Sequence, residues 1–381
     1  MISIPKKRFE TLDSLRGVCA ILVLCYHVRI YSSFTETSII RSANFFVEFF
    51  FVLSGFVMLH SYGKQQFDRP RLGSYMKSRF FRLYPLHLAM LIVVVGIELI
   101  KLYVSKIGLN FNNVPFTAST TPNQLLPNLL LLNAILPSAR SMTFNIVSWS
   151  ISVEFFLYIL LGLVLFRNTR TRNTLFCAIM LLGFYLLLIN NTLIFKVELL
   201  RGLSCFFGGC ICYLIYEAVN ITRPMKALFT FLELLVIGLI CAILMAPFGN
   251  KGPVISLTFF FAVWVFAQEK GAVSNLLRHA SFKYLGKLSY SIYMVHYVFW
   301  YNIIALAIIL SKLMHREFTA NIFTEGKMVR MITVHNYWLA QLTILGIMGS
   351  IIVISHFTYK YIELKGIALG KRFSQLKPIT A

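Results

Sequence analysis

The sequence predicts an all-α polytopic membrane bundle of about ten transmembrane helices, with both chain termini on the cytoplasmic side. Three observations support this fold class. The 381 residues are 58% hydrophobic and only 13% charged, and the mean hydropathy is +0.74. Apolar runs long enough to cross about 30 Å of hydrocarbon recur along the whole chain. The Lys and Arg residues concentrate in alternate loops between these runs.

Hydropathy places all the spans in a single membrane domain, residues 1–381, and predicts no fused extracytoplasmic domain. The expected spans are residues 15–31, 44–62, 86–104, 149–166, 175–194, 199–217, 227–246, 253–267, 284–310 and 339–359. With a cytoplasmic N-terminus, the inside loops contain more than twice as many Lys and Arg residues as the outside loops. This asymmetry follows the positive-inside rule. It explains the net charge of +22 without a nucleic-acid partner.

Two outside loops are longer than the others, at about residues 105–148 and 311–338. The first contains an apolar segment between Pro122 and Pro137 that is too short to span easily, which favours a re-entrant or interfacial helix over an eleventh span. No amphipathic β pattern is present. The seven cysteines lie mostly in apolar runs without metal-ligand spacing, so we expect buried thiols, no disulfide framework and no metal site.

The first span carries two ionisable residues, Arg16 and His27. Eleven residues of α-helix turn through about 1,100°, so both side chains share one face, about 16 Å apart along the axis. In a structural interpretation, Asp13 caps the helix, Arg16 extends to the interface and His27 bonds a neighbouring helix. In a functional interpretation, His27 is a general base, because ionisable groups in membrane helices usually face the protein interior.

A second constellation is the arginine pair at the start of the third span. Arg79 and Arg82 are three residues apart, so they can share a helix face and bind phosphates in a bidentate manner. The positive-inside rule also accounts for cations in this loop. The spacing alone therefore favours neither explanation: the two arginines could bind phosphates, or they could only reflect the positive charge of a cytoplasmic loop.

Two carboxylates lie inside apolar spans. Glu48 is either solvated near the outer interface or turned toward a cavity, and the nearby Ser54-Gly55 pair permits close helix approach or a helix break. Glu154, in the segment that begins at Trp149, is costly unless it pairs, and His27 or an arginine is a candidate partner.

The last expected cluster is LGKLSYSIYMVHY, where Ser289, Tyr293 and His296 follow helical spacing. Side chains at this spacing can reach a neighbouring helix together. We favour hydrogen bonding between helices over catalysis for this cluster.

Taken in order, six segments resemble the acyltransferase-3 family of membrane acyltransferases. They are RFETLDSLRG with His27 following, FFFVLSGFVM, the Arg79 and Arg82 pair before Tyr84-Pro85, WSISVEFFLY, LGKLSYSIYMVHY and YKYIE. They cover nearly the whole chain, and together they are far more specific than any one alone.

The resemblance implies an integral enzyme, expected in the bacterial cytoplasmic (inner) membrane. It transfers an acyl group, commonly acetyl, from cytoplasmic acyl-CoA to a hydroxyl of an extracytoplasmic or lipid-linked glycan. The resemblance implies that His27 is catalytic, that Arg16 is its basic partner, and that Arg79 and Arg82 serve the acyl donor. No permanently bound cofactor is implied, since acetyl-CoA is a substrate.

Other residues receive supporting roles in this interpretation. Glu48 stands where we expect an aspartate in the family, and it competes with Glu154 as the carboxylate that supports His27. The further supporting residues are Asp13, Ser54, Trp149, Tyr293 and His296.

The competing class of protein is a transporter or flippase for an anionic or glycan substrate, without acyl transfer. Ten helices with a basic cytoplasmic mouth suit that class as well. Against it, no internal repeat relates two halves of the chain. The expected partners are acyl-CoA, the glycan acceptor and membrane lipids; the sequence predicts no oligomeric state.

Overall fold

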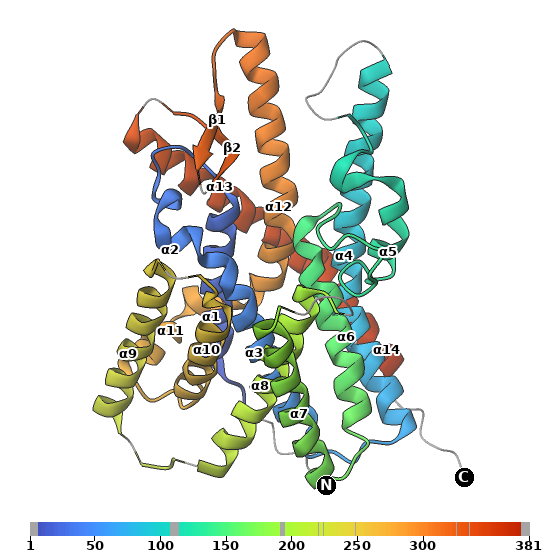
Figure 1. Ribbon diagram of the computed structural model, residues 1–381, viewed down its shortest axis with the longest axis vertical. Helices are drawn as coiled ribbons and strands as arrows, with labels where there is room; N and C mark the ends of the chain where they lie inside the picture. The colour runs from blue at the N-terminus through green and yellow to red at the C-terminus, as the bar shows by residue number, and fades with distance from the viewer. Residues whose placement is uncertain are drawn as a thin grey trace.

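The computed structural model describes residues 7–106, 114–190, 195–219, 221–223, 225–247, 249–324, 326–334 and 336–374. Within these residues, eight helices are long and apolar enough to cross a membrane, which confirms the polytopic all-α prediction (Figure 1). They are α3 (Phe46–Tyr62), α4 (Arg69–Lys106), α6 (Trp149–Val164), α7 (Thr169–Leu188), α8 (Val197–Val219), α9 (Lys226–Met245), α12 (Ala280–Met314) and α13 (Tyr337–Thr358).

The other two expected spans are helices as well, α1 (Glu10–His27) and the shorter apolar α10 (Lys251–Ala267). Of the fifth expected span, residues 191–194 lie outside the described residues. The expected span at 86–104 is only the second half of α4, because the helix starts at Arg69. Arg79 and Arg82 therefore lie inside a regular helix, as their spacing requires.

The first span is shorter than predicted and ends at His27 instead of residue 31. A β-hairpin is the reason: the Tyr31 amide donates to the Ile332 carbonyl at 2.9 Å, and the Ile332 amide donates to the Arg29 carbonyl at 3.2 Å. The hairpin consists of the antiparallel strands β1 (Thr319–Thr324) and β2 (Lys327–Ile332). The expectation of no β pattern was wrong for this loop.

The apolar segment after Pro122 forms the short helix α5 (Leu125–Leu129) and turns, so the described residues contain no eleventh span there. Short helices also occur at α2 (Ser38–Arg41) and α11 (Ala272–Leu277). A π-helical turn at Tyr359–Glu363 joins α13 to α14 (Leu364–Ser374). The seven cysteines are free thiols, and five of them are buried.

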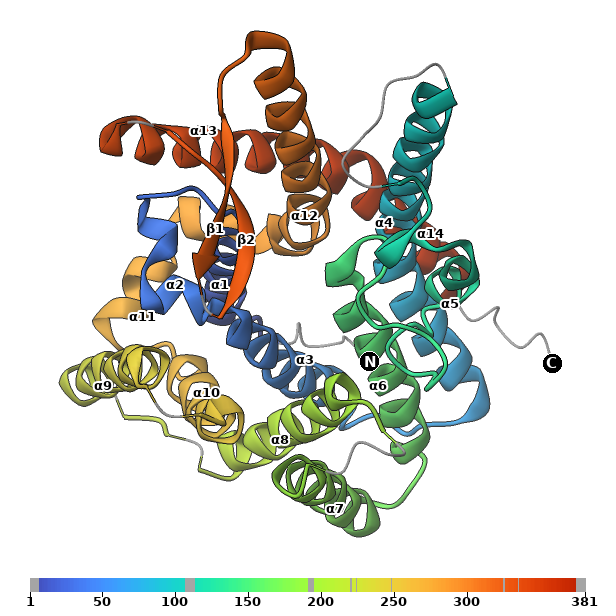
Figure 2. The same cartoon turned by 45° about the horizontal axis from the view of Figure 1, so that its top comes forward.

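Helix α3 runs through the middle of the bundle, against α8 and α10 (Figure 2). Glycines allow the backbones of α3 and α8 to touch. A Cβ added to Gly55 would lie 1.8 Å from the Phe206 carbonyl oxygen, and one added to Gly209 would lie 2.0 Å from that of Val52. The predicted close approach at Ser54-Gly55 is confirmed, and the helix does not break there.

Glycines also allow close backbone contact between α1 and α12. A Cβ on Gly17 would lie 2.5 Å from the Gly286 amide nitrogen, and one on Gly286 would lie 2.4 Å from the Asp13 carbonyl oxygen. Because neither glycine tolerates a larger residue, the two helices stay in close contact. This crossing brings the face of Arg16 and His27 onto α12.

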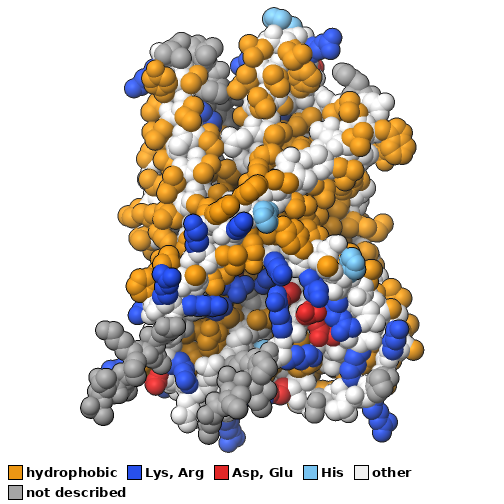
Figure 3. All heavy atoms as spheres, turned by 180° about the vertical axis from the view of Figure 1, so that it is seen from behind, with side chains coloured by type: hydrophobic (Ala, Val, Ile, Leu, Met, Phe, Trp, Pro, Cys, Tyr) orange, Lys and Arg blue, Asp and Glu red, His pale blue; other side chains and the backbone are white. Residues whose placement is uncertain are grey.

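Loops that are expected on one side of the membrane meet at one end of the bundle. Lys7 Nζ donates to the Tyr216 hydroxyl at 2.9 Å, and Arg172 donates to the Gly63 carbonyl at 2.7 Å. At the other end, the Ser42 hydroxyl donates to the Leu244 carbonyl at 3.0 Å. Lys and Arg gather on one half of the face shown in Figure 3. That this basic end is cytoplasmic stays a prediction.

Candidate functional site

The centre of the bundle holds a cavity between α1, α3, α4, α6 and α12, here called the inner cavity. Its polar lining consists of Arg16, Ser54, Arg79, Arg82, Ser150, Glu154, Tyr158, Ser289, Tyr290 and Tyr293. Three arginines and one carboxylate leave the lining with a formal charge of +2. The sequence-predicted cationic residues are thus brought together, although they come from α1 and α4.

Arg16 is held in the inner cavity by α12. Its Nε donates to the Ser289 hydroxyl at 2.8 Å, and its Nη2 lies 3.4 Å from the Gly286 carbonyl oxygen. Asp13 accompanies it at 3.7 Å, one turn earlier on α1. Asp13 does not cap α1, because the helix begins at Glu10 with Phe9 at the cap position. The Thr11 amide of the first turn donates to the Glu269 carboxylate at 3.0 Å.

Arg79 and Arg82 differ in how they are held. Arg79 donates to the Tyr62 hydroxyl at 3.3 Å and to Met58 Sδ at 3.5 Å, while its buried Nε has no partner. Arg82 makes no hydrogen bond or ion pair with any described residue, although it interacts electrostatically with Glu154. Both guanidinium groups therefore retain donors for a further ligand.

Glu154 is satisfied by hydroxyl groups instead of by a cation. Its Oε1 accepts from the Ser54 hydroxyl at 2.7 Å and from the Tyr158 hydroxyl one turn along α6. None of the hydrogen bonds within the described chain joins Glu154 to His27, which was one of its candidate partners. The carboxylate instead faces the arginines across the inner cavity.

His27 contacts a second histidine on α12. His27 Nδ1 lies 3.0 Å from the Val23 carbonyl oxygen and 3.1 Å from His296 Nε2. His296 is fully buried, whereas His27 is half-buried. The predicted hydrogen bonding of the α12 cluster to another helix is therefore confirmed, and its partner is the candidate base.

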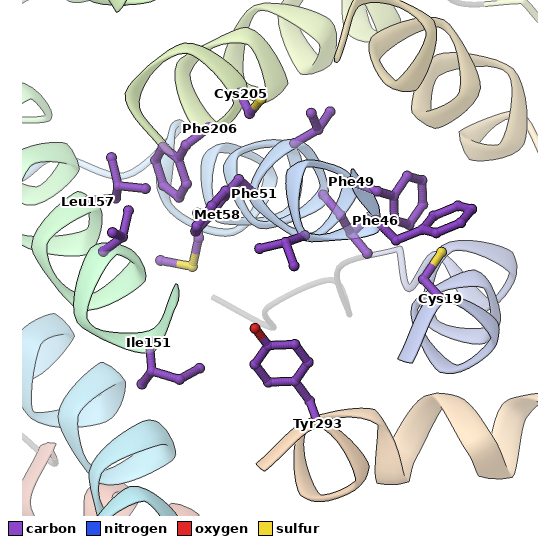
Figure 4. Close-up of a cluster of buried hydrophobic side chains, with 14 of the residues drawn as sticks. Cys19, Phe46, Phe49, Phe51, Met58, Ile151, Leu157, Cys205, Phe206 and Tyr293 are labelled. Atoms are coloured by element: carbon purple, nitrogen blue, oxygen red, sulfur yellow. The ribbon is translucent and has the colours of Figure 1, made fainter. Parts of the chain in front are cut away.

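Tyr293 lies between the inner cavity and the histidine pair. Its hydroxyl lines the cavity and accepts from the Ser150 hydroxyl at 2.9 Å, and its ring centroid lies 5.7 Å from that of His296. Figure 4 shows the ring projecting from α12 with its hydroxyl directed into the bundle. The cavity therefore reaches toward the histidines without including them.

Glu48 lies in a different cavity, here called the outer cavity, between α3, α7, α8 and α10. It is buried, and its Oε1 accepts from Arg201 Nε at 2.7 Å. The Arg201 guanidinium lies 5.2 Å from the centre of the Trp149 ring, which gives Trp149 a supporting role. Sequence reasoning missed Arg201, although an arginine inside an apolar span was the available signal.

Glu363 is a second residue that sequence reasoning missed. It closes the YKYIE segment, is buried, and accepts a hydrogen bond from the Ser291 hydroxyl at 2.9 Å. It also interacts electrostatically with Arg82 and Arg16. It lies beyond the end of the predicted span 339–359, so hydropathy did not single it out.

The geometry defines a class of protein: a polytopic helical membrane protein with a buried, cation-rich cavity beside a histidine pair. No group of three His, Cys, Asp or Glu side chains in the described ranges could hold a metal ion. Residues 9–360 match the family model described as an acyltransferase domain. The chain belongs to this acyltransferase-3 family of membrane acyltransferases.

Two curated proteins resemble parts of the chain. "Protein 2 in picA locus" of Rhizobium radiobacter is 38% identical over 84 residues, which is 22% of this chain and 42% of that protein. "Acyltransferase MdmB" of Streptomyces mycarofaciens is 28% identical over 181 residues, which is 45% of this chain and 43% of that protein. The chain thus spans less than half the length of these relatives. No solved structure matches.

Proposed function

We propose that the protein is a membrane O-acyltransferase that moves an acyl group, by default acetyl, from cytoplasmic acyl-CoA to a hydroxyl of an extracytoplasmic or lipid-linked glycan. The observation that carries this proposal is the inner cavity, in which three arginines face one carboxylate. Coenzyme A bears several phosphate charges. Guanidinium groups suit phosphates because they donate two parallel, charge-assisted hydrogen bonds.

Arg79 and Arg82 are our candidates for the donor phosphates, since both keep unused donors at the cavity wall. The pantetheine arm would then extend along the cavity past Arg16 toward Tyr293, and so carry the thioester toward the histidine pair. Family membership supports an acyl donor, and coenzyme A is our inference from the charge of the cavity.

In the proposed chemistry, His27 acts as the general base. It takes the proton of the acceptor hydroxyl while the hydroxyl oxygen attacks the thioester carbonyl and the sulfur leaves. A route through an acyl-histidine uses the same residue as the nucleophile. In both routes His27, the thioester and the acceptor hydroxyl must come within reacting distance of one another. Since the donor reaches His27 from the inner cavity, we place the acceptor on the opposite, outer side of His27.

The remaining candidate residues have supporting roles in the inner or the outer cavity. Glu154, held by Ser54, limits the positive charge beside the donor. Glu48 keeps Arg201 in place over Trp149, and Asp13 accompanies Arg16. We place the basic end and both termini in the cytoplasm of a bacterial cell, with residues 1–381 as one membrane domain, so that the donor enters from the side where acyl-CoA is made.

Donor binding tests the proposal without knowledge of the acceptor. Acetyl-CoA is titrated by calorimetry into the protein in nanodiscs, beside the Arg79→Ala, Arg82→Ala double variant. The expected result is saturable binding and a Kd at least about tenfold higher in the variant, because two charge-assisted hydrogen bonds are lost.

The matched control is Arg69→Ala, Lys77→Ala, which removes the same charge from exposed positions of α4 outside the cavity. Its Kd should change by less than about threefold, as exposed charges contribute little. Folded protein that binds no acetyl-CoA would overturn the proposal and favour transport of an anionic or glycan substrate instead.

A further inference from the structure

The two histidines between α1 and α12 form one hydrogen-bonded unit with defined proton positions. His296 Nδ1 lies 3.2 Å from the Ile292 carbonyl oxygen, one turn earlier on its own helix. A carbonyl oxygen only accepts, so the proton of His296 sits on Nδ1. A neutral imidazole carries one proton, which leaves His296 Nε2 as an acceptor.

This acceptor fixes the neighbouring ring. His27 Nδ1 is the atom 3.1 Å from His296 Nε2, and it is also 3.0 Å from the Val23 carbonyl oxygen. Both neighbours are acceptors, so His27 Nδ1 must carry the proton and donate. The opposite tautomer would direct the Nδ1 lone pair at two other lone pairs.

The other side of the His27 ring is left basic. With the proton on Nδ1, His27 Nε2 holds a lone pair, and no described residue hydrogen-bonds to it. The rings of Tyr26 and Tyr297 pack against the His27 ring, with centroids 4.9 Å and 5.6 Å from its centroid. Two imidazolium cations in contact would repel each other, so the two rings are not protonated together.

We propose that His296 is a positioning residue that holds His27 in the Nδ1–H tautomer, so that His27 Nε2 is the nitrogen that reacts. This inference rests on the proposed function for its consequence in catalysis. In direct transfer, Nε2 takes the hydroxyl proton and the oxygen bonds to the thioester carbonyl carbon. The carbon–sulfur bond then breaks, and the thiolate takes the proton back from Nε2, which gives an ester and free coenzyme A.

A glutamine at position 296 separates this role from simple packing. The Gln amide oxygen can accept from His27 Nδ1–H, whereas a leucine of similar size cannot. We expect His296→Leu to lower kcat by about 3- to 10-fold with the KM for acetyl-CoA unchanged, because one of the two acceptors for His27 Nδ1–H is lost while the Val23 carbonyl remains. His296→Gln should keep kcat within about twofold of the parent.

The matched control is His356→Leu, since His356 bonds the Tyr284 hydroxyl on the far side of α12 and touches neither cavity. Its kcat should equal that of the parent. Equal losses for His296→Gln and His296→Leu, or full activity in His296→Leu, would overturn the positioning role.

Nitrogen-15 NMR of histidine-labelled protein in nanodiscs tests the tautomer without any assay of transfer. The His27 signal, identified by its loss in His27→Gln, should show a protonated Nδ1 and an unprotonated Nε2. In His296→Leu the signal should shift toward the Nε2–H form. A protonated Nε2 in the parent protein would refute the tautomer, whereas the expected spectrum in a protein that transfers no acyl group would retain the tautomer and refute the proposed function.

Discussion

The inner and outer cavities hold the same kinds of charge in opposite arrangements. In the outer cavity, Glu48 and Arg201 neutralise each other at 2.7 Å. In the inner cavity, Glu154 is held by hydroxyl groups, and Arg79 and Arg82 form no ion pair with any described residue. Buried charges are costly unless paired, so an unpaired set is retained only where something else compensates it.

This contrast separates a structural charge pair from a ligand site. The outer pair neutralises its own charge and links α3 to α8, although Glu48 Oε2 is buried without a hydrogen-bond partner. The lining of the inner cavity has a formal charge of +2, and of its three arginines Arg16 has an acidic side chain nearby, Asp13 at 3.7 Å, whereas Arg79 and Arg82 are available to a bound anion. Substitutions in the outer cavity should therefore act on stability, and those in the inner cavity on binding. The following predictions test this division, from the largest expected effect to the smallest.

The largest effect is expected at His27, outside both cavities. His27→Ala should lower acyl transfer by about 10²- to 10⁴-fold, which is the usual contribution of a general base. Its Kd for acetyl-CoA should stay within about twofold of the parent, because no donor-binding arginine contacts His27. Transfer is measured as release of free coenzyme A at equal expression, with His356→Ala as the control. Full transfer by His27→Ala would remove the base from the mechanism.

The second effect concerns the outer pair. Arg201→Ala leaves Glu48 buried and unpaired, and should lower the free energy of unfolding by about 3–5 kcal/mol. Replacement of both residues, Glu48→Leu with Arg201→Leu, should recover much of this loss because no charge remains buried. The measurement is the thermal unfolding midpoint in detergent. A double variant as unstable as Arg201→Ala would mean that the pair stabilises the fold by more than mutual neutralisation.

The third effect is the counterpart in the inner cavity. Arg82→Ala removes a side chain with no hydrogen bond to the described protein, so the unfolding midpoint should hardly move. The Kd for acetyl-CoA should rise about 10- to 100-fold, which corresponds to one charge-assisted contact of about 1.5–3 kcal/mol. A fall in stability without loss of affinity would show that Arg82, like Arg201, stabilises the fold and does not bind the donor. That result would contradict the proposed difference between the two cavities.

Local sequence signals predicted the helices and the residues on one helix face. The spans followed from hydropathy, and Arg16 and His27 both meet α12 because eleven residues return a helix to the same face. The close approach at Ser54-Gly55 also followed from residue size. These features depend on the residue types within short stretches of chain and on how such stretches partition into a membrane. Both can be judged from the sequence alone.

Pairings between distant helices could not be predicted in the same way. Glu48 meets Arg201 across 153 positions of sequence, and Glu154 meets Ser54 across 100. Periodicity gives the face of a helix but not its neighbour, so both carboxylates were assigned to His27 as candidates. The end of α1 was misplaced for the same reason, since the hairpin strand that pairs with it lies about 300 residues away.

The smallest predicted effect distinguishes charge from shape in the inner cavity. Glu154→Gln keeps an oxygen that accepts from Ser54 and Tyr158, but removes the negative charge that offsets the arginines. The Kd for acetyl-CoA should fall about threefold to tenfold, because a repulsion of about 1 kcal/mol across several Å of cavity is lost. Replacement of both Glu48 and Arg201 by Gln is the control and should leave the Kd unchanged, since it alters no net charge and neither residue lines the inner cavity. Weaker binding in Glu154→Gln would show that the carboxylate organises the cavity instead of limiting its charge, and the excess of positive charge would then be set by Arg16, Arg79 and Arg82 alone.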